Sequence, residues 1–91
     1  MPTVAVFYGI VIRMYFFDHN PPHFHAQYGR ARALVRISDG EIIAGALPKT
    51  ATRMIREWAL DRREQLELNW RNASVGIALE RIPGPDGDGH E

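Results

Sequence analysis

The residues best suited to chemistry lie together in residues 18–26, DHNPPHFHA. This stretch holds three of the four histidines of the 91-residue chain and two of its six prolines. Each proline fixes its own φ and pushes the preceding residue toward extended geometry, so the backbone is stiff beside the histidines. A stiff backbone that carries polar side chains suits either a preformed site or a tight structural turn.

A divalent metal site is one chemistry that this stretch predicts. Alternate side chains of a strand leave the same face, so His23 and His25 point to one side. His19 and Asp18 lie just before the rigid turn, from which they can fold back toward the pair. The metal ligands expected are therefore His19, His23, His25 and Asp18, a set that suits Zn²⁺, Ni²⁺ or Fe²⁺. The chain has no cysteine, which excludes thiolate sites.

The same histidines can also act without a metal. An imidazole moves protons near neutral pH and a guanidinium holds phosphate, so histidines beside arginines suit a phosphodiester substrate such as RNA. In this interpretation the catalytic residues are His19, His23 and His25, and the anion-binding residues are Arg32 and Arg36. Arg13 and Arg30 can widen this basic patch.

A third interpretation is structural. His19 caps the Pro-Pro turn, and Asp18 bonds backbone N–H groups of the turn. His23 and His25 then fill a half-buried sheet face whose other members are apolar. These apolar members are Leu34, Ile43 and Leu47. Such a face is too apolar to be wholly solvated, so we expect it to bind a second copy or another protein.

Four or five strands are predicted from β-branched and aromatic runs separated by turn signals. The runs cover residues 4–7, 10–17, 24–28, 31–37 and 41–47. Gly29-Arg30 and Asp39-Gly40 both fit two-residue hairpin turns, and Asp39-Gly40 is the clearer signal. Tight turns between consecutive strands favour an antiparallel meander.

The two turns also predict the register of the hairpins. A loop at Gly29-Arg30 pairs Phe24 with Val35, and a loop at Asp39-Gly40 pairs Val35 with Ala44. Because opposed residues share a face, both hairpins place apolar side chains on one side of the sheet. The opposite face is then formed by His23, His25, Gln27, Arg32, Leu34, Arg36, Ile43 and Leu47.

One long helix is predicted after the sheet. Apolar residues recur at three- and four-residue spacing from Ala51 to Trp70, and Thr50 is the expected N-cap. Val75 to Ile82 can form a short final strand. The fold class expected is α+β, an antiparallel β-meander of four to five strands with one long α-helix packed on one face.

Length and composition predict a single domain over residues 1–82, with a modest core. Residues 83–91, rich in Pro, Gly and Asp, are predicted to be a disordered tail in which His90 has no function. Eleven Lys and Arg balance eleven Asp and Glu, so only a local patch can attract RNA. No signal peptide and no apolar run of bilayer length is seen, and a cytoplasmic protein without membrane contact is expected.

Several short motifs occur together along the chain. They are Met1-Pro2-Thr3, the string Asp18-His19-x-Pro21-Pro22-His23-x-His25, Asp39-Gly40 followed by Gly45-x-Leu47-Pro48, and a helix with Trp58, Leu66 and Trp70. This combination resembles the bacterial family called domain of unknown function 4160 over about residues 1–82. The resemblance implies no established catalytic residues, but it marks Asp18 and the three nearby histidines as positions of the family signature.

The resemblance also implies a role. Members of the family are typically small stand-alone bacterial proteins, often encoded beside another small uncharacterised domain, which suggests a toxin–antitoxin-type pair. We therefore expect a partner-binding module of such a pair that uses the His/Arg-rich sheet face, with a small protein encoded nearby or a second copy as partner. The alternative is a metal-dependent or histidine-based enzyme that acts on a phosphodiester such as RNA.

Overall fold

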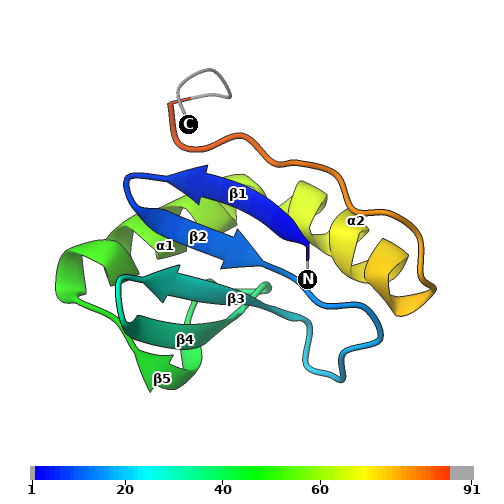
Figure 1. The fold of residues 1–91 in the computed structure, drawn as a ribbon, viewed down its shortest axis with the longest axis horizontal. Helices are drawn as coiled ribbons and strands as arrows, with labels where there is room; N and C mark the ends of the chain where they lie inside the picture. The colour runs from blue at the N-terminus through cyan, green and yellow to red at the C-terminus, as the bar shows by residue number, and fades with distance from the viewer. Residues whose placement is uncertain (1, 87–91) are drawn as a thin grey trace.

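The fold is an antiparallel sheet covered by helices, seen in a computed structural model that describes residues 2–86. The strands lie side by side in chain order, β1-β2-β3-β4-β5 (Figure 1). The elements are β1 (Thr3–Phe7), β2 (Ile10–Arg13), β3 (His23–Tyr28), β4 (Ala31–Arg36), β5 (Ile42–Ala46), α1 (Lys49–Asp61) and α2 (Arg63–Ser74). The predicted α+β class and the antiparallel meander are confirmed.

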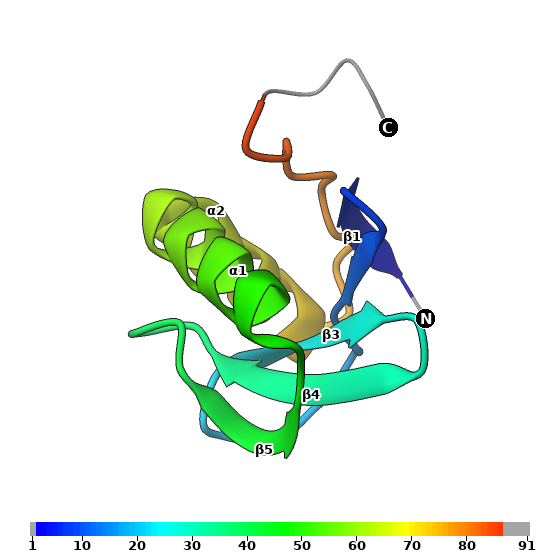
Figure 2. The ribbon, with the colours of Figure 1, turned by 90° about the vertical axis from the view of Figure 1, so that its left-hand side faces the viewer.

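Both helices cover the same face of the sheet, as Figure 2 shows. Side chains that alternate toward the helices, such as Ile12 on β2 and Phe24 on β3, are fully buried. Trp58 of α1 and Leu66 of α2 join them in one apolar core. Burying a side chain of this size contributes about 1.5–3 kcal/mol, so this layer holds the helices on the sheet.

Strand β2 is shorter than the strand predicted over residues 10–17, because the chain leaves the sheet after Arg13. Phe17 has a φ of +57°, and its N–H donates to Ala73 O at the end of α2 over 3.1 Å. A positive φ is uncommon for a residue other than glycine and is typical of turns. This turn leads into the loop that carries Asp18.

The register of β3 with β4 agrees with the prediction, since Phe24 pairs with Val35. The predicted register of β4 with β5 is wrong. Val35 pairs with Ile42 and Leu34 pairs with Ala44, so Ile43 is an extra residue between the two pairs. Beyond this bulge the alternation of β5 is inverted relative to the prediction.

The turn before β5 explains the error. Gly40 N–H donates to Arg36 O and Arg36 N–H donates to Glu41 O, both over 2.8 Å, so the turn is longer than two residues. The Asp39 carboxylate accepts bonds from the Arg36 guanidinium and from Glu41 N–H inside this turn. Because the bulge at Ile43 inverts the alternation beyond it, Leu47, predicted on the outer face, packs against the core. A side chain that bonds its own turn thus overrode the two-residue signal.

The prediction of one long helix is wrong, because the helix is divided at Arg62. This residue has φ −108° and ψ 21°, outside helical geometry. Its guanidinium donates to Pro83 O over 3.1 Å and to Gly84 O over 2.7 Å. The division therefore lies where the C-terminal segment, residues 75–86, contacts the helices. It does not depend on a proline or glycine within the helical sequence. The first helix begins at Lys49 with Pro48, not Thr50, as its N-cap.

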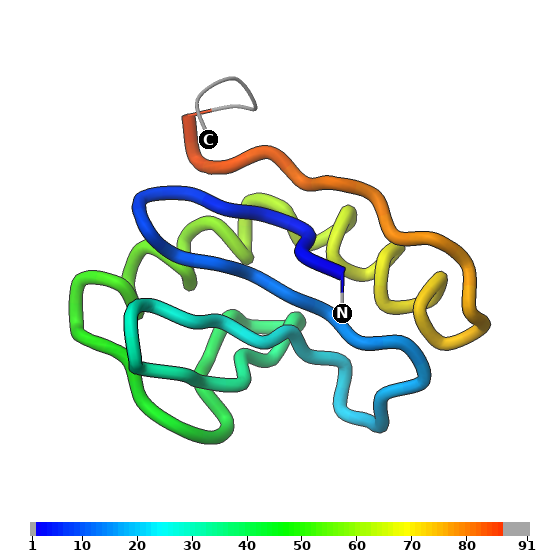
Figure 3. Tube along the Cα trace, in the orientation of Figure 1, coloured from blue at the N-terminus to red at the C-terminus, as the bar shows by residue number. Residues whose placement is uncertain are grey.

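The predicted strand over residues 75–82 is also wrong, although the segment is ordered and runs beside β1 (Figure 3). Ile82 N–H donates to Val4 O over 2.8 Å, but no ladder forms. Asn69 of α2 instead bonds Glu80 twice: its side-chain N–H₂ donates to Glu80 O, and its carbonyl accepts from Glu80 N–H, each over 2.9 Å. A buried amide side chain thus satisfies backbone groups that a strand partner would otherwise bond.

The fold extends slightly beyond the predicted domain end at residue 82. Pro83 O accepts the Trp58 indole N–H over 2.8 Å, and Gly84 is buried. The rest of the predicted tail from residue 87 onward, including His90, lies outside the described residues. Among the helices of residues 2–86, neither has the length and apolar character needed to span a bilayer.

Candidate functional site: a histidine–aspartate cluster

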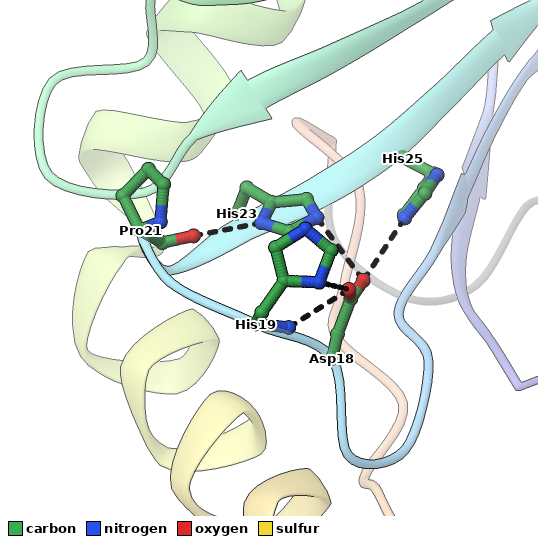
Figure 4. Close-up of polar contacts among 5 residues, drawn as sticks. All are labelled: Asp18, His19, Pro21, His23 and His25. Atoms are coloured by element: carbon green, nitrogen blue, oxygen red, sulfur yellow. Dashed lines mark hydrogen bonds and ion pairs between the residues drawn. The ribbon is translucent and has the colours of Figure 1, made fainter.

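The loop between β2 and β3 folds back so that Asp18 faces the start of β3. One carboxylate oxygen, Asp18 Oδ2, lies 3.1 Å from His23 Nε2 and 3.3 Å from His25 Nε2 (Figure 4). The two histidines leave the same side of β3, as the strand alternation predicts. Asp18, His23 and His25, hereafter the triad, form the group among the described residues that could hold a metal ion, with ligand atoms within 4.8 Å of one another.

The orientation of the His23 ring is set by the backbone. His23 Nδ1 lies 2.7 Å from Pro21 O, and a carbonyl oxygen can only accept, so Nδ1 carries a proton. The neutral ring therefore presents the lone pair of Nε2 to Asp18. A lone pair facing a carboxylate oxygen at 3.1 Å is repulsive unless a proton or a metal cation lies between them.

The triad is largely buried but still accessible to solvent. The His23 side chain is 5% exposed, that of Asp18 16% and that of His25 33%. Burial opposes ionisation of Asp18, but the hydrogen bond from His19 N–H, the hydrogen bond with the His25 side chain and the electrostatic effect of His23 and His25 outweigh it, so the pKa of Asp18 is lowered. The carboxylate is therefore ionised and available as an anionic ligand.

The two separations from Asp18 to the histidines suit a small tetrahedral ion. With metal–ligand bonds of the usual length, ligand atoms around tetrahedral zinc lie about 3.3 Å apart. The two measured separations from Asp18 Oδ2, 3.1 and 3.3 Å, are close to that value. The Nδ1–H of His23 bonded to a backbone carbonyl is the kind of contact that orients a metal-binding histidine.

His19 is the predicted ligand that the structure leaves outside the triad. Its side chain is 93% exposed, and its Nδ1 lies 3.4 Å from the other oxygen, Asp18 Oδ1. Its backbone N–H donates to that same oxygen over 2.9 Å, as the structural interpretation of Asp18 in a turn expects. The cis peptide bond between Asn20 and Pro21 lies between His19 and His23.

Two aromatic residues complete the surroundings of the triad. The Trp70 ring of α2 lies 5.3 Å from the His23 ring, and the Tyr15 ring lies edge-on to His25 at 4.3 Å. Sequence reasoning did not connect Trp70 with the histidines, because that contact joins residues far apart in the chain.

The chain matches the family described as Domain of unknown function (DUF4160) over residues 9–71, more than half of its length. The chain belongs to this family. The matched range contains the whole triad and ends before the C-terminal segment. No match was found among curated proteins or among solved structures.

The predicted anion-binding arginines of this DUF4160 domain are in different situations. Arg36 donates to Asp39 over 2.7 and 3.1 Å, so its charge is used within the turn before β5. Arg32 is exposed on β4 and lines a pocket beside His25. Arg13 lines the same pocket from β2. Arg36 is thus opposite His23 in the sheet but bonds Asp39, whereas Arg13 and Arg32 line the pocket beside His25.

Proposed function

We propose that this DUF4160 domain binds one divalent metal ion through the triad and uses it on a phosphate-ester substrate. Zinc is the first choice, with iron and nickel as the other candidates. The observation that carries the proposal is the Nδ1–H of His23 bonded to Pro21 O, because it turns the Nε2 lone pair toward Asp18 and His25.

The donor set supports this proposal. Two imidazole nitrogens and one carboxylate are ligands that zinc and ferrous iron both accept, and three protein ligands leave a coordination position open. A divalent ion with an open position supplies Lewis acidity and lowers the pKa of a water molecule. The residues themselves would hold the ion, and Pro21 and Trp70 would orient His23.

The competing explanation is an ion pair without metal. A doubly protonated His23 donates to both Pro21 O and Asp18, which also removes the lone-pair repulsion. This arrangement would be structural, or it would serve histidine-based acid–base chemistry. The two explanations differ in whether the domain has affinity for a metal.

Calorimetric titration of the untagged, chelator-treated protein with Zn²⁺, Ni²⁺ or Fe²⁺ separates them. We expect one ion per chain, and a loss of affinity of at least about 100-fold in Asp18→Asn and in His25→Gln, more than loss of an orienting partner costs. His19→Ala is the matched control and should bind as the wild type does. Circular dichroism checks that each variant is folded.

Two results would contradict the metal proposal. The first is affinity no tighter than about 1 mM for all three ions. The second is an equal loss in His19→Ala and His25→Gln, which would indicate unspecific binding by exposed imidazoles.

We also propose a partner-binding role of the toxin–antitoxin type, as the family resemblance suggests. The observation that favours it is the edge strand β5, of which four of five residues are exposed. Its sequence, IIAGA, has no charged residue and no proline, two common protections of sheet edges against pairing, and the bulge at Ile43 is the protection that it does carry. Such an edge can accept a strand from a partner.

Analytical ultracentrifugation tests this second role, with the chain alone and mixed with the small protein encoded beside it. Ile43→Asp on β5 should dissociate the complex, because a charge at the edge opposes strand addition. Leu60→Asp, at an exposed position on α1, is the control. This role would be ruled out if the chain stayed monomeric and formed no complex with the small protein encoded beside it.

A further inference from the structure

A pocket of about 200 Å³ lies on the sheet face opposite the helices, next to the triad. Arg13 on β2, His25 and Gln27 on β3, and Arg32 on β4 contribute to its lining, together with Tyr15. His25 therefore belongs both to the pocket and to the triad. Whatever the pocket holds lies beside the candidate metal centre.

The pocket is positively charged. None of its lining residues is acidic, and among the ion pairs of residues 2–86 neither Arg13 nor Arg32 is paired with a carboxylate. Arg36 and Arg62, in contrast, both have acidic partners. Two guanidiniums without a carboxylate, on strands separated by β3, leave their charge available to a ligand.

One of these arginines is held in place by an amide. Gln27 Nε2 donates to Gly29 O over 3.1 Å, which turns Gln27 Oε1 toward Arg13. Arg13 Nη1 donates to that oxygen over 2.8 Å. A guanidinium has five N–H donors, so this bond orients Arg13 and leaves other donors for a ligand. Fixing an arginine beforehand lowers the entropic cost of binding.

We propose that this pocket is a seat for a phosphate group. A single guanidinium fork satisfies a planar carboxylate, whereas two forks from opposite sides suit a tetrahedral anion with several oxygens. The neighbourhood of His25 would bring a seated phosphate ester next to the triad. The use of the seat in catalysis rests on the proposed metal function, but phosphate binding itself does not require a metal.

A nuclear magnetic resonance titration tests the seat in metal-free, ¹⁵N-labelled full-length protein. The probes are sodium phosphate, uridine monophosphate and the dinucleotide UpU. We expect saturable shifts of the backbone amides of Arg13, Gln27 and Arg32. Binding of UpU would identify a phosphodiester ligand, and binding of phosphate and the monophosphate alone would identify a terminal phosphate.

Variants separate a seat from general attraction to positive charge. Arg13→Gln and Arg32→Gln should each weaken binding by about five-fold or more, because each removes charged hydrogen bonds. Gln27→Glu places a carboxylate beside Arg13 and should weaken phosphate binding to a similar extent. Arg30→Gln removes one charge from the adjacent turn, outside the pocket, and should change the affinity by less than about two-fold.

The proposal would be contradicted if Arg30→Gln and Arg32→Gln weakened phosphate binding equally. It would also be contradicted if the chemical-shift changes were located away from the pocket. Failure of all three probes to bind would contradict it as well. Asp18→Asn distinguishes this outcome from failure of the metal proposal. That variant should lose zinc affinity and keep phosphate binding, so each proposal can fail while the other stands.

Discussion

His23 illustrates how a backbone contact decides the chemistry of a side chain. Its Nδ1 is committed to Pro21 O, and its ring is buried against Trp70. Only Nε2 is left for other chemistry, and it faces Asp18. His19, four residues earlier, is 93% exposed and contacts the other oxygen of Asp18, although both histidines belong to the same sequence motif.

The protonation of His23 can be measured directly. In metal-free protein, ¹⁵N spectra of the imidazole nitrogens should show a proton on Nδ1 of His23, because its partner can only accept. Added Zn²⁺ should change the Nε2 signal of His23 and of His25, and leave the ring of His19 unchanged. A His23 ring without a proton on Nδ1 would contradict the orientation described here.

Gly45 is a second residue whose role depends on its surroundings. It has a φ of +78°, and a Cβ at this position would lie 2.3 Å from Arg32 O. Gly29 also has a positive φ, +59°, but no atom lies within 4 Å of its would-be Cβ. Substitutions at these two glycines therefore distinguish the cost of conformational strain from the cost of steric overlap.

We predict that Gly29→Ala lowers the free energy of unfolding by about 1–2 kcal/mol, the cost of a left-handed φ for an L-residue. Gly45→Ala should lower it further, because β4 and β5 must also separate to admit the methyl group. Urea unfolding followed by circular dichroism measures both values. Equal losses in the two variants would show that the overlap at Gly45 is relieved without cost.

At the scale of elements, the C-terminal segment is bonded to α2 as well as to β1. Asn69 is 1% exposed and bonds both backbone groups of Glu80. Ile82 behind it is buried in the core. One amide side chain therefore helps to position a segment that runs beside β1.

Asn69→Ala should lower the free energy of unfolding by about 2 kcal/mol, because it removes the two hydrogen bonds between the Asn69 side chain and the Glu80 backbone. Hydrogen exchange should show faster exchange at Glu80 and Ile82, with β3 still protected. Gln65→Ala, at an exposed position on α2, is the control and should change little. Unchanged protection at Glu80 would contradict the proposed role of Asn69 in holding this segment.

Across the whole molecule, the triad connects parts of the chain that are distant in sequence. Asp18 lies after β2, His23 and His25 lie on β3, and Trp70 of α2 packs on His23. The Phe17 N–H bond to Ala73 O joins the same loop to the end of α2. A ligand that binds the triad only in the folded state should therefore stabilise the entire domain.

Thermal unfolding tests this linkage. At a free zinc concentration of 100 times the dissociation constant, binding contributes about 2.7 kcal/mol. For a domain of this length, that should raise the Tm by about 10 °C or more. Asp18→Asn should show no such increase. A wild-type Tm that is insensitive to zinc would argue against binding in the folded state.

A structural feature could be predicted from the sequence when the interactions that determine it are local. The alternation of β3 placed His23 and His25 on one side, and the register with β4 followed from Gly29-Arg30. Both features arise from neighbouring residues and from the two-residue period of a strand. The register of β5 could not be predicted, because the Asp39 side chain bonds within its own turn and lengthens it.

The sequence by itself thus determined the α+β class, the family and the presence of a histidine–aspartate group. Only the tertiary structure decided which members of that group meet, that Arg13 joins Arg32 while Arg36 turns to Asp39, and that the helix divides at Arg62. The physical reason is the range of the interactions. Periodicity and turn chemistry act over a few residues, whereas these outcomes depend on packing and hydrogen bonds between segments that meet only when the chain is folded.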